Sequence, residues 1–136
     1  MRVAICAVAL LLASNAAAHH SLSLFETNAP VTLQGVVKRV DWRSPHTLIF
    51  VETQEGGVAT EWRVETVPNS WLINRAGWTI DSVKPGERVT VELYIYSDKT
   101  IKYGFLRRVV KADGKVWASP LDIGRRGERE AAERAQ

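Results

Sequence analysis

From residue 31 onward, apolar and polar positions mostly alternate with a period of two, which indicates β-strands with one buried face. The alternation is clearest over residues 58–66, where Trp62 and Val64 lie between charged neighbours. Glycine, proline, asparagine and aspartate residues separate the alternating segments and are typical of turns. The pattern predicts five strands, over residues 31–42, 47–53, 58–66, 88–96 and 101–110.

The first of these strands changes phase along its length. Val31 and Leu33 share one parity, whereas Val36 and Val40 share the other. Gly35 lies where the phase changes, and a glycine in that position predicts a bulge or a sharp coil. Such a bend allows one strand to serve two faces of a barrel.

One short helix is predicted between the third and fourth strands. Asn69 or Ser70 can cap the free N–H groups of its first turn, and Gly77 suits the left-handed position that ends a helix. After the fifth strand, Asp113-Gly114 predicts a tight turn, and residues 116–117 can fold back as a short extra strand.

The predicted order of elements is β-β-β-α-β-β, with a long bent first strand. This order is that of the OB-type barrel, in which closure removes exposed strand edges. A chain of 136 residues fits one such domain. We therefore expect a mainly β fold, a small five-stranded OB-like barrel over residues 31–119 with one short helix.

Residues 1–18 are typical of a secretory signal peptide. An uncharged apolar run follows Arg2, and Ala16 and Ala18 occupy the two positions that signal peptidase recognises. The run is shorter than the about 20 residues that a membrane-spanning helix needs. We expect cleavage before His19, a periplasmic or secreted product, and no stable membrane insertion.

The mature chain would contain no thiol, since the single cysteine, Cys6, lies within the signal. Disulfides and thiol chemistry are thereby excluded. Loss of Arg2 would lower the formal net charge from +3 to +2. A net charge this close to zero does not indicate binding to nucleic acid or to an anionic membrane. A flexible segment at 19–30 and a charged tail at 120–136 are expected to flank the barrel.

The histidines are candidate metal ligands. Cleavage before His19 would place a free α-amino group and an imidazole on one residue, a chelate that suits Cu(II). His46, at the start of the second strand, could add a nitrogen to a site formed with His19 and His20. Cleavage before Ala18 would instead make His20 the third residue, which can bind Cu(II) or Ni(II) with backbone nitrogens. The alternative is that the pair binds nothing and that His46 hydrogen-bonds a loop carbonyl.

Other residue patterns argue against an enzyme. The chain contains no Gly-x-Ser-x-Gly elbow, phosphate-binding glycine loop or His-Glu-x-x-His motif. Arg107 and Arg108, with Lys102 and Lys111, form a basic stripe that we expect to be a solvated face. At least three of the five tryptophans are expected to lie in the core rather than to form a stacking platform.

A series of short motifs runs through residues 18–112: Ala18-His19-His20-Ser21, Phe25-Glu26, Pro30-Val31-Thr32-Leu33-Gln34-Gly35, Asp41-Trp42, Pro45-His46, Trp62, Pro68-Asn69, Arg75-Ala76-Gly77-Trp78 and Lys84-Pro85-Gly86. Together they resemble a bacterial family of small exported proteins known only as a domain of unknown function. The resemblance implies an OB-type barrel behind a signal peptide and supplies no activity. The family's Asn-Pro-His is Ser44-Pro45-His46 here, so the histidine is kept and the amide is lost.

We therefore expect a soluble periplasmic binding protein that takes Cu(II) through His19, His20 and His46, in handling or sensing the metal rather than as an enzyme. The competing hypothesis is a metal-independent interaction module. Its barrel groove would take a peptide, a glycan or an envelope protein.

Overall fold

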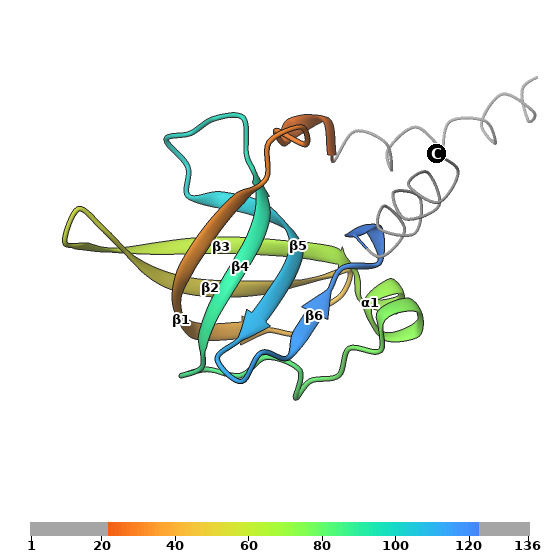
Figure 1. The fold of residues 1–136 in the computed structure, drawn as a ribbon. Coiled ribbons are helices and arrows are strands. Elements are labelled where there is room, and N and C mark those ends of the chain that lie inside the picture. The colour runs from red at the N-terminus through yellow and green to blue at the C-terminus, as the bar shows by residue number, and fades with distance from the viewer. Residues whose placement is uncertain (1–21, 123–136) are drawn as a thin grey trace, which may run out of the picture.

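The computed structural model describes residues 22–122, and these form a mainly β fold (Figure 1). The predicted strands and helix are all present, with ends within two residues of the predicted ones. The elements are η1 Leu22–Leu24, β1 Val31–Asp41, β2 His46–Glu55, β3 Val58–Pro68, α1 Asn69–Ala76, β4 Arg88–Ile95, β5 Tyr103–Lys111 and β6 Val116–Ala118. No helix within the described residues is both long and apolar enough to cross a membrane.

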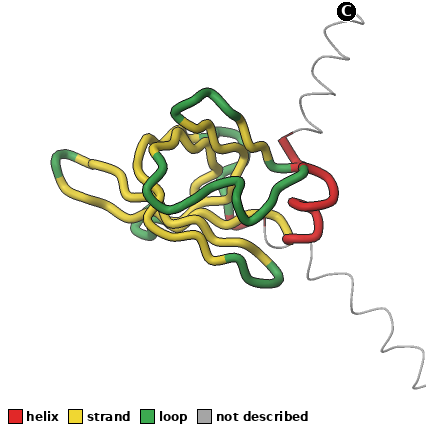
Figure 2. The backbone as a smooth tube through the Cα atoms, turned by 90° about the horizontal axis from the view of Figure 1, so that it is seen from below, coloured by secondary structure: helices red, strands yellow, loops and turns green. Residues whose placement is uncertain are grey.

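The five main strands close into a barrel. β1, β2 and β3 form an antiparallel meander, β1 also pairs with β4, and β4 pairs with β5. A parallel contact between β3 and β5, in which Val64 faces Gly104, completes the closure. The strands surround a common interior (Figure 2), and α1 connects β3 to β4. This topology confirms the predicted OB-like barrel.

β1 bends so that its two halves pair with different strands. Residues 31–36 pair with β4, and residues 36–41 pair with β2. The two backbones approach closely at the bend, because a Cβ atom on Gly35 would lie only 2.3 Å from the carbonyl oxygen of Glu52. The sharp coil predicted at Gly35 is therefore confirmed.

The side chains of β1 change face beyond the bend rather than at it. The register with β2 shifts between Val37 and Arg39, which marks a bulge. The sequence places this change at Gly35, too early, because Val36 and Val37 are both apolar and only Val37 is fully buried.

The tryptophans belong mainly to the core. Trp62 and Trp78 are buried, and Trp42 and Trp117 are half-buried against the same cluster of apolar side chains. Trp71, on helix α1, is exposed. The prediction that at least three tryptophans are core residues is confirmed.

Helix α1 begins without the predicted side-chain cap. Pro68 is its N-cap residue, and neither Asn69 nor Ser70 caps the first turn. Gly77 ends the helix in the left-handed region, with φ of 68°, as predicted. The helix buries Leu72 in the core.

Within residues 22–30, the described part of the predicted flexible segment, Leu22 and Phe25 pack against the barrel. Phe25 is buried, and its ring lies 5.6–5.7 Å from the rings of Tyr96, Tyr103 and Phe105. The backbone of Phe25 also bridges to that of Tyr96. These aromatic contacts hold Phe25 against the barrel.

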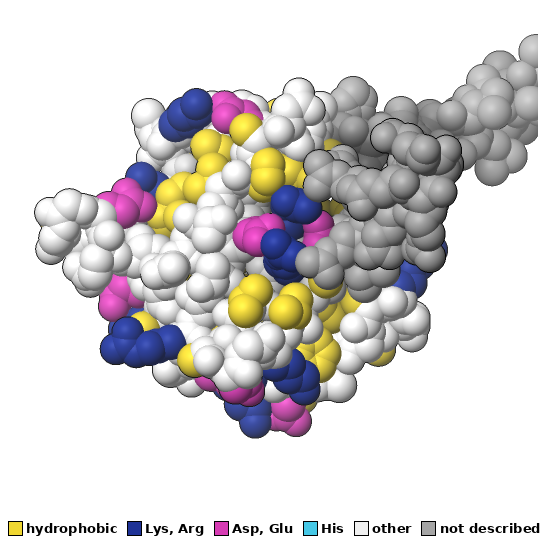
Figure 3. All heavy atoms as spheres, in the orientation of Figure 1, with side chains coloured by type: hydrophobic (Ala, Val, Ile, Leu, Met, Phe, Trp, Pro, Cys, Tyr) yellow, Lys and Arg dark blue, Asp and Glu magenta, His cyan; other side chains and the backbone are white. Residues whose placement is uncertain are grey.

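The prediction that the basic side chains of β5 form a solvated face is wrong. Arg107 contacts both Asp122 and Glu92, and Arg108 contacts Glu92 as well. Burial alone would lower the pKa of Arg107, but the hydrogen bond and charge of Asp122 raise it above its ordinary value. Lys111 pairs with Glu87. Acidic and basic side chains are likewise mixed on the face seen in Figure 3.

Candidate functional site

Of the three predicted metal ligands, the structure describes one. His19 and His20 lie outside the described residues, as does the predicted signal at 1–18. His46 is the first residue of β2 and is half-buried, with a side chain 25% exposed.

The loop before His46 is tied to the start of helix α1. The backbone N–H of Asn69 donates to the carbonyl oxygen of Pro45 at 2.9 Å, and its side-chain Nδ2 donates to that of Arg43 at 3.0 Å. Its Oδ1 accepts a hydrogen bond from Thr47 Oγ1 at 2.8 Å. These bonds fix the chain on both sides of His46 and explain why Asn69 does not cap the helix.

Glu65 connects His46 to a tyrosine on another strand. One carboxylate oxygen of Glu65 contacts His46 Nδ1, and the other accepts a hydrogen bond from the hydroxyl of Tyr103. A carboxylate can only accept, so Nδ1 carries the proton in this contact. In the neutral ring the Nε2 lone pair is then available for a metal ion or a proton.

Tyr103 is held in turn by its neighbours. The guanidinium of Arg63 lies 4.5 Å from the centroid of the Tyr103 ring, and the ring of Phe25 lies 5.6 Å away. A continuous series of contacts therefore runs from Phe25 through Tyr103 and Glu65 to His46. The N-terminal segment, β5, β3 and β2 each contribute one member.

The partners of His46 could not have been identified from the sequence. Glu65 follows the alternation of the third strand and is correctly predicted on its outer face. Its neighbour Tyr103 comes from β5, which meets β3 only through barrel closure. A parallel contact between strands almost 40 residues apart leaves no local pattern in the sequence.

His46 does not form a complete metal site with other described residues. Between Leu22 and Asp122, no group of three or more histidine, cysteine or acidic side chains could hold a metal ion. The described part of the chain thus offers one oriented imidazole, and further ligands would have to come from elsewhere.

The role of Asn69 can be tested by replacing it with alanine. Asn69→Ala removes an amide that joins the loop and β2, so we expect a loss of about 1–2 kcal/mol in the free energy of unfolding. Asn74→Ala is the matched control, because Asn74 is exposed on the same helix. Urea denaturation measures both, and an equal change in the two variants would contradict the anchoring role.

Comparison with known proteins gives a family and a weak structural likeness. Among curated proteins, none matches this chain. Mitochondrial single-stranded DNA binding protein Rim1 of S. cerevisiae is similar over 62% of this chain and 94% of its own, with 14% identity and a TM-score of 0.44. A likeness at this level says nothing about what this chain binds. A family of unknown function, DUF6152, matches residues 7–105, which is most of the chain, and this protein belongs to that family.

Proposed function

We propose that this protein is exported and binds Cu(II) through its N-terminal histidines and the Nε2 atom of His46. The observation that carries the proposal is the contact between His46 Nδ1 and Glu65. Histidines that bind metals commonly donate their other ring N–H to a carboxylate, which fixes the tautomer and makes the ligating nitrogen more basic.

The packing of the N-terminal segment supports a site shared with His19 and His20. Leu22 lines a small cavity together with Phe105, and Phe105 is the register partner of Glu65. His20 is two residues before Leu22 in the sequence. Leu22, the first described residue after this pair of histidines, therefore packs on the strand that neighbours the strand of Glu65, which supports a shared site.

The donor set favours copper among the common divalent metals. An α-amino nitrogen and imidazole nitrogens are ligands that Cu(II) binds more strongly than other first-row divalent ions. Removal of residues 1–18 would create the amino group at His19. Removal of one residue fewer would leave His20 in third position, a second arrangement that suits Cu(II). Both forms assign the protein a binding role and require no reaction.

Copper binding is tested by titration of the protein purified from the bacterial periplasm, after intact-mass measurement of its N-terminus. We expect one Cu(II) per chain, with submicromolar affinity in competition with a chelator. His46→Ala should weaken binding by about tenfold or more. Glu65→Gln should weaken it by about tenfold, because the amide loses the carboxylate charge and keeps only one acceptor oxygen for the two groups, His46 and Tyr103, that the carboxylate binds.

Glu61→Gln is the matched control for Glu65→Gln. Glu61 lies on the same outer face of β3 and is exposed, so its loss should leave the copper affinity unchanged. Affinity that is micromolar or weaker in the parent protein, or equal in the parent and His46→Ala, would reject the site. A mass that retains residues 1–18 would reject the export on which the amino ligand depends.

A further inference from the structure

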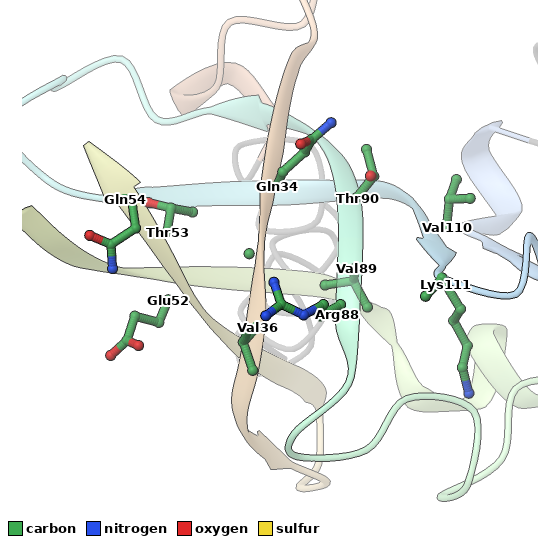
Figure 4. Close-up of a pocket in the computed structure, with 12 residues that line it drawn as sticks. Gln34, Val36, Glu52, Thr53, Gln54, Arg88, Val89, Thr90, Val110 and Lys111 are labelled. Atoms are coloured by element: carbon green, nitrogen blue, oxygen red, sulfur yellow. The ribbon is translucent and has the colours of Figure 1, made fainter. Parts of the chain in front are cut away.

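A cleft with a volume of 720 Å³ opens on the barrel where β1 bends (Figure 4). Residues of β1, β2, β4 and β5 line it, and polar side chains predominate among those that the figure labels. The volume lies in the range of about 300–1,000 Å³ that is usual for ligand sites. The cleft is distinct from the surroundings of His46, which does not line it.

Two strand edges face this cleft. The register between β1 and β2 ends at the pair Val36 and Glu52, yet β2 continues to Glu55 beside β3. Before Val36, residues 31–35 of β1 pair with β4 alone among the described strands. The two strands thus diverge from the bend, and each has an edge without a neighbour. Such edges can accept an added strand.

Three polar side chains of the cleft are free to bind a ligand, as far as the described residues show. Gln34, Gln54 and Thr90 line it and form no hydrogen bonds through their side chains with the described residues. Their amide and hydroxyl groups offer both donors and acceptors. They come from three different strands, so a ligand between them would be held from several directions.

The cleft also carries one positive charge without a partner. Arg88 is exposed, and within residues 22–122 it contacts neither a carboxylate nor an aromatic ring. Figure 4 shows its side chain extending from β4 towards β1, at a level between Gln34 and Val36. The neighbouring Glu52 is already paired with Lys38, at 3.6 Å. The charge balance therefore favours a ligand with a negative group.

We propose that this cleft binds an extended peptide segment that adds to the free edge of β1 at residues 31–35 and places an acidic side chain on Arg88. A small anion would use Arg88 but leave the strand edge unpaired. A peptide uses both, because its main chain pairs with β1 and its carboxylate pairs with the guanidinium. The site is independent of the proposed copper site.

Titration followed by amide NMR shifts tests the peptide site, with a metal chelator present throughout. The probe is the blocked peptide Ac-Thr-Val-Glu-Val-Thr-NH2, and the comparison peptide carries lysine in place of glutamate. We expect saturable shifts confined to residues 31–36, 52–55 and 88–90, with Kd of about 1 mM or tighter. Arg88→Gln should weaken binding by about fivefold, the effect of one exposed ion pair.

Arg75→Gln is the matched control, because Arg75 lies over Trp71 on α1 and does not line the cleft. Its affinity for the peptide should equal that of the parent. Equal binding of the lysine peptide, or an unchanged affinity in Arg88→Gln, would overturn the proposal that Arg88 binds an acidic side chain of the peptide. Acetate that produced the same shifts would identify a small-anion site, and shifts that did not saturate by about 10 mM would overturn the peptide site altogether. Because the chelator excludes copper, none of these outcomes depends on the metal proposal.

Discussion

Replacing Trp78 with alanine is expected to lower the free energy of unfolding by about 4 kcal/mol. Trp78 is 1% exposed and has the largest of the fully buried side chains among residues 22–122. Its ring packs against Trp117 of β6 with centroids 5.7 Å apart, and its Nε1 donates to the carbonyl oxygen of Ala118 at 2.9 Å. Alanine would leave a large cavity and an unpaired carbonyl group, and chemical denaturation monitored by far-UV circular dichroism would measure the loss.

Trp71→Ala is the matched control, because it removes the same atoms from an exposed position. The Trp71 side chain is 39% exposed, and its main described contact is the guanidinium of Arg75, 4.2 Å from the ring centroid. An exposed contact of this kind contributes about 0.5–1 kcal/mol. If the two substitutions cost the same, the difference in burial between these tryptophans would be refuted.

A contrast between the buried Trp62 and the exposed Trp71 shows what the local sequence could predict. Trp62 lies in a strand, where alternation separates buried from exposed positions, and its burial was predictable. Trp71 lies in an eight-residue helix, which is too short for a clear apolar stripe. The adjacent Leu72 enters the core instead. Only the direction in which the helix leaves β3 decides which of the two side chains is buried.

The fold was predictable because each strand carries its own pattern and the turns carry glycine and proline. The sequence placed the change of face in β1 too early. The extra residue of the bulge, between Val37 and Arg39, lies in a run where the alternation of apolar and polar residues does not reveal it. The pairing of side chains across the barrel was even harder to predict from the sequence. The basic stripe on β5 was misjudged because its partners, Glu92 and Asp122, reach it only in the folded chain.

The candidate site was predictable only in part, because its side-chain contacts also form only in the folded chain. His46 could be singled out as a residue type, and its position at the start of a strand is correct. Its contact with Glu65, and that of Glu65 with Tyr103, depend on the register of three strands. The free edge beside the cleft depends on where β1 leaves β2, and sequence alone gave only the glycine that permits the bend.

That bend provides the second large effect, since Gly35→Ala is expected to lower the free energy of unfolding by about 3 kcal/mol. The new methyl group would lie 2.3 Å from the carbonyl oxygen of Glu52 and 2.9 Å from Cγ1 of Val51. The carbonyl belongs to the backbone of β2, so it cannot rotate away as a side chain could. The strands must separate at the point where β1 passes from β4 to β2, and thermal or urea denaturation would measure the cost.

Gln34→Ala is the control for the Gly35 substitution, because Gln34 is the preceding residue of β1 and its side chain is exposed. We expect this change to stay within about 0.5 kcal/mol of the parent, as surface substitutions usually do. If Gly35→Ala lowered the free energy of unfolding by an equally small amount, β1 and β2 would be able to move apart without an energetic penalty. The close approach would then not define the bend, and the diverging edges beside it would not be a fixed feature of the barrel.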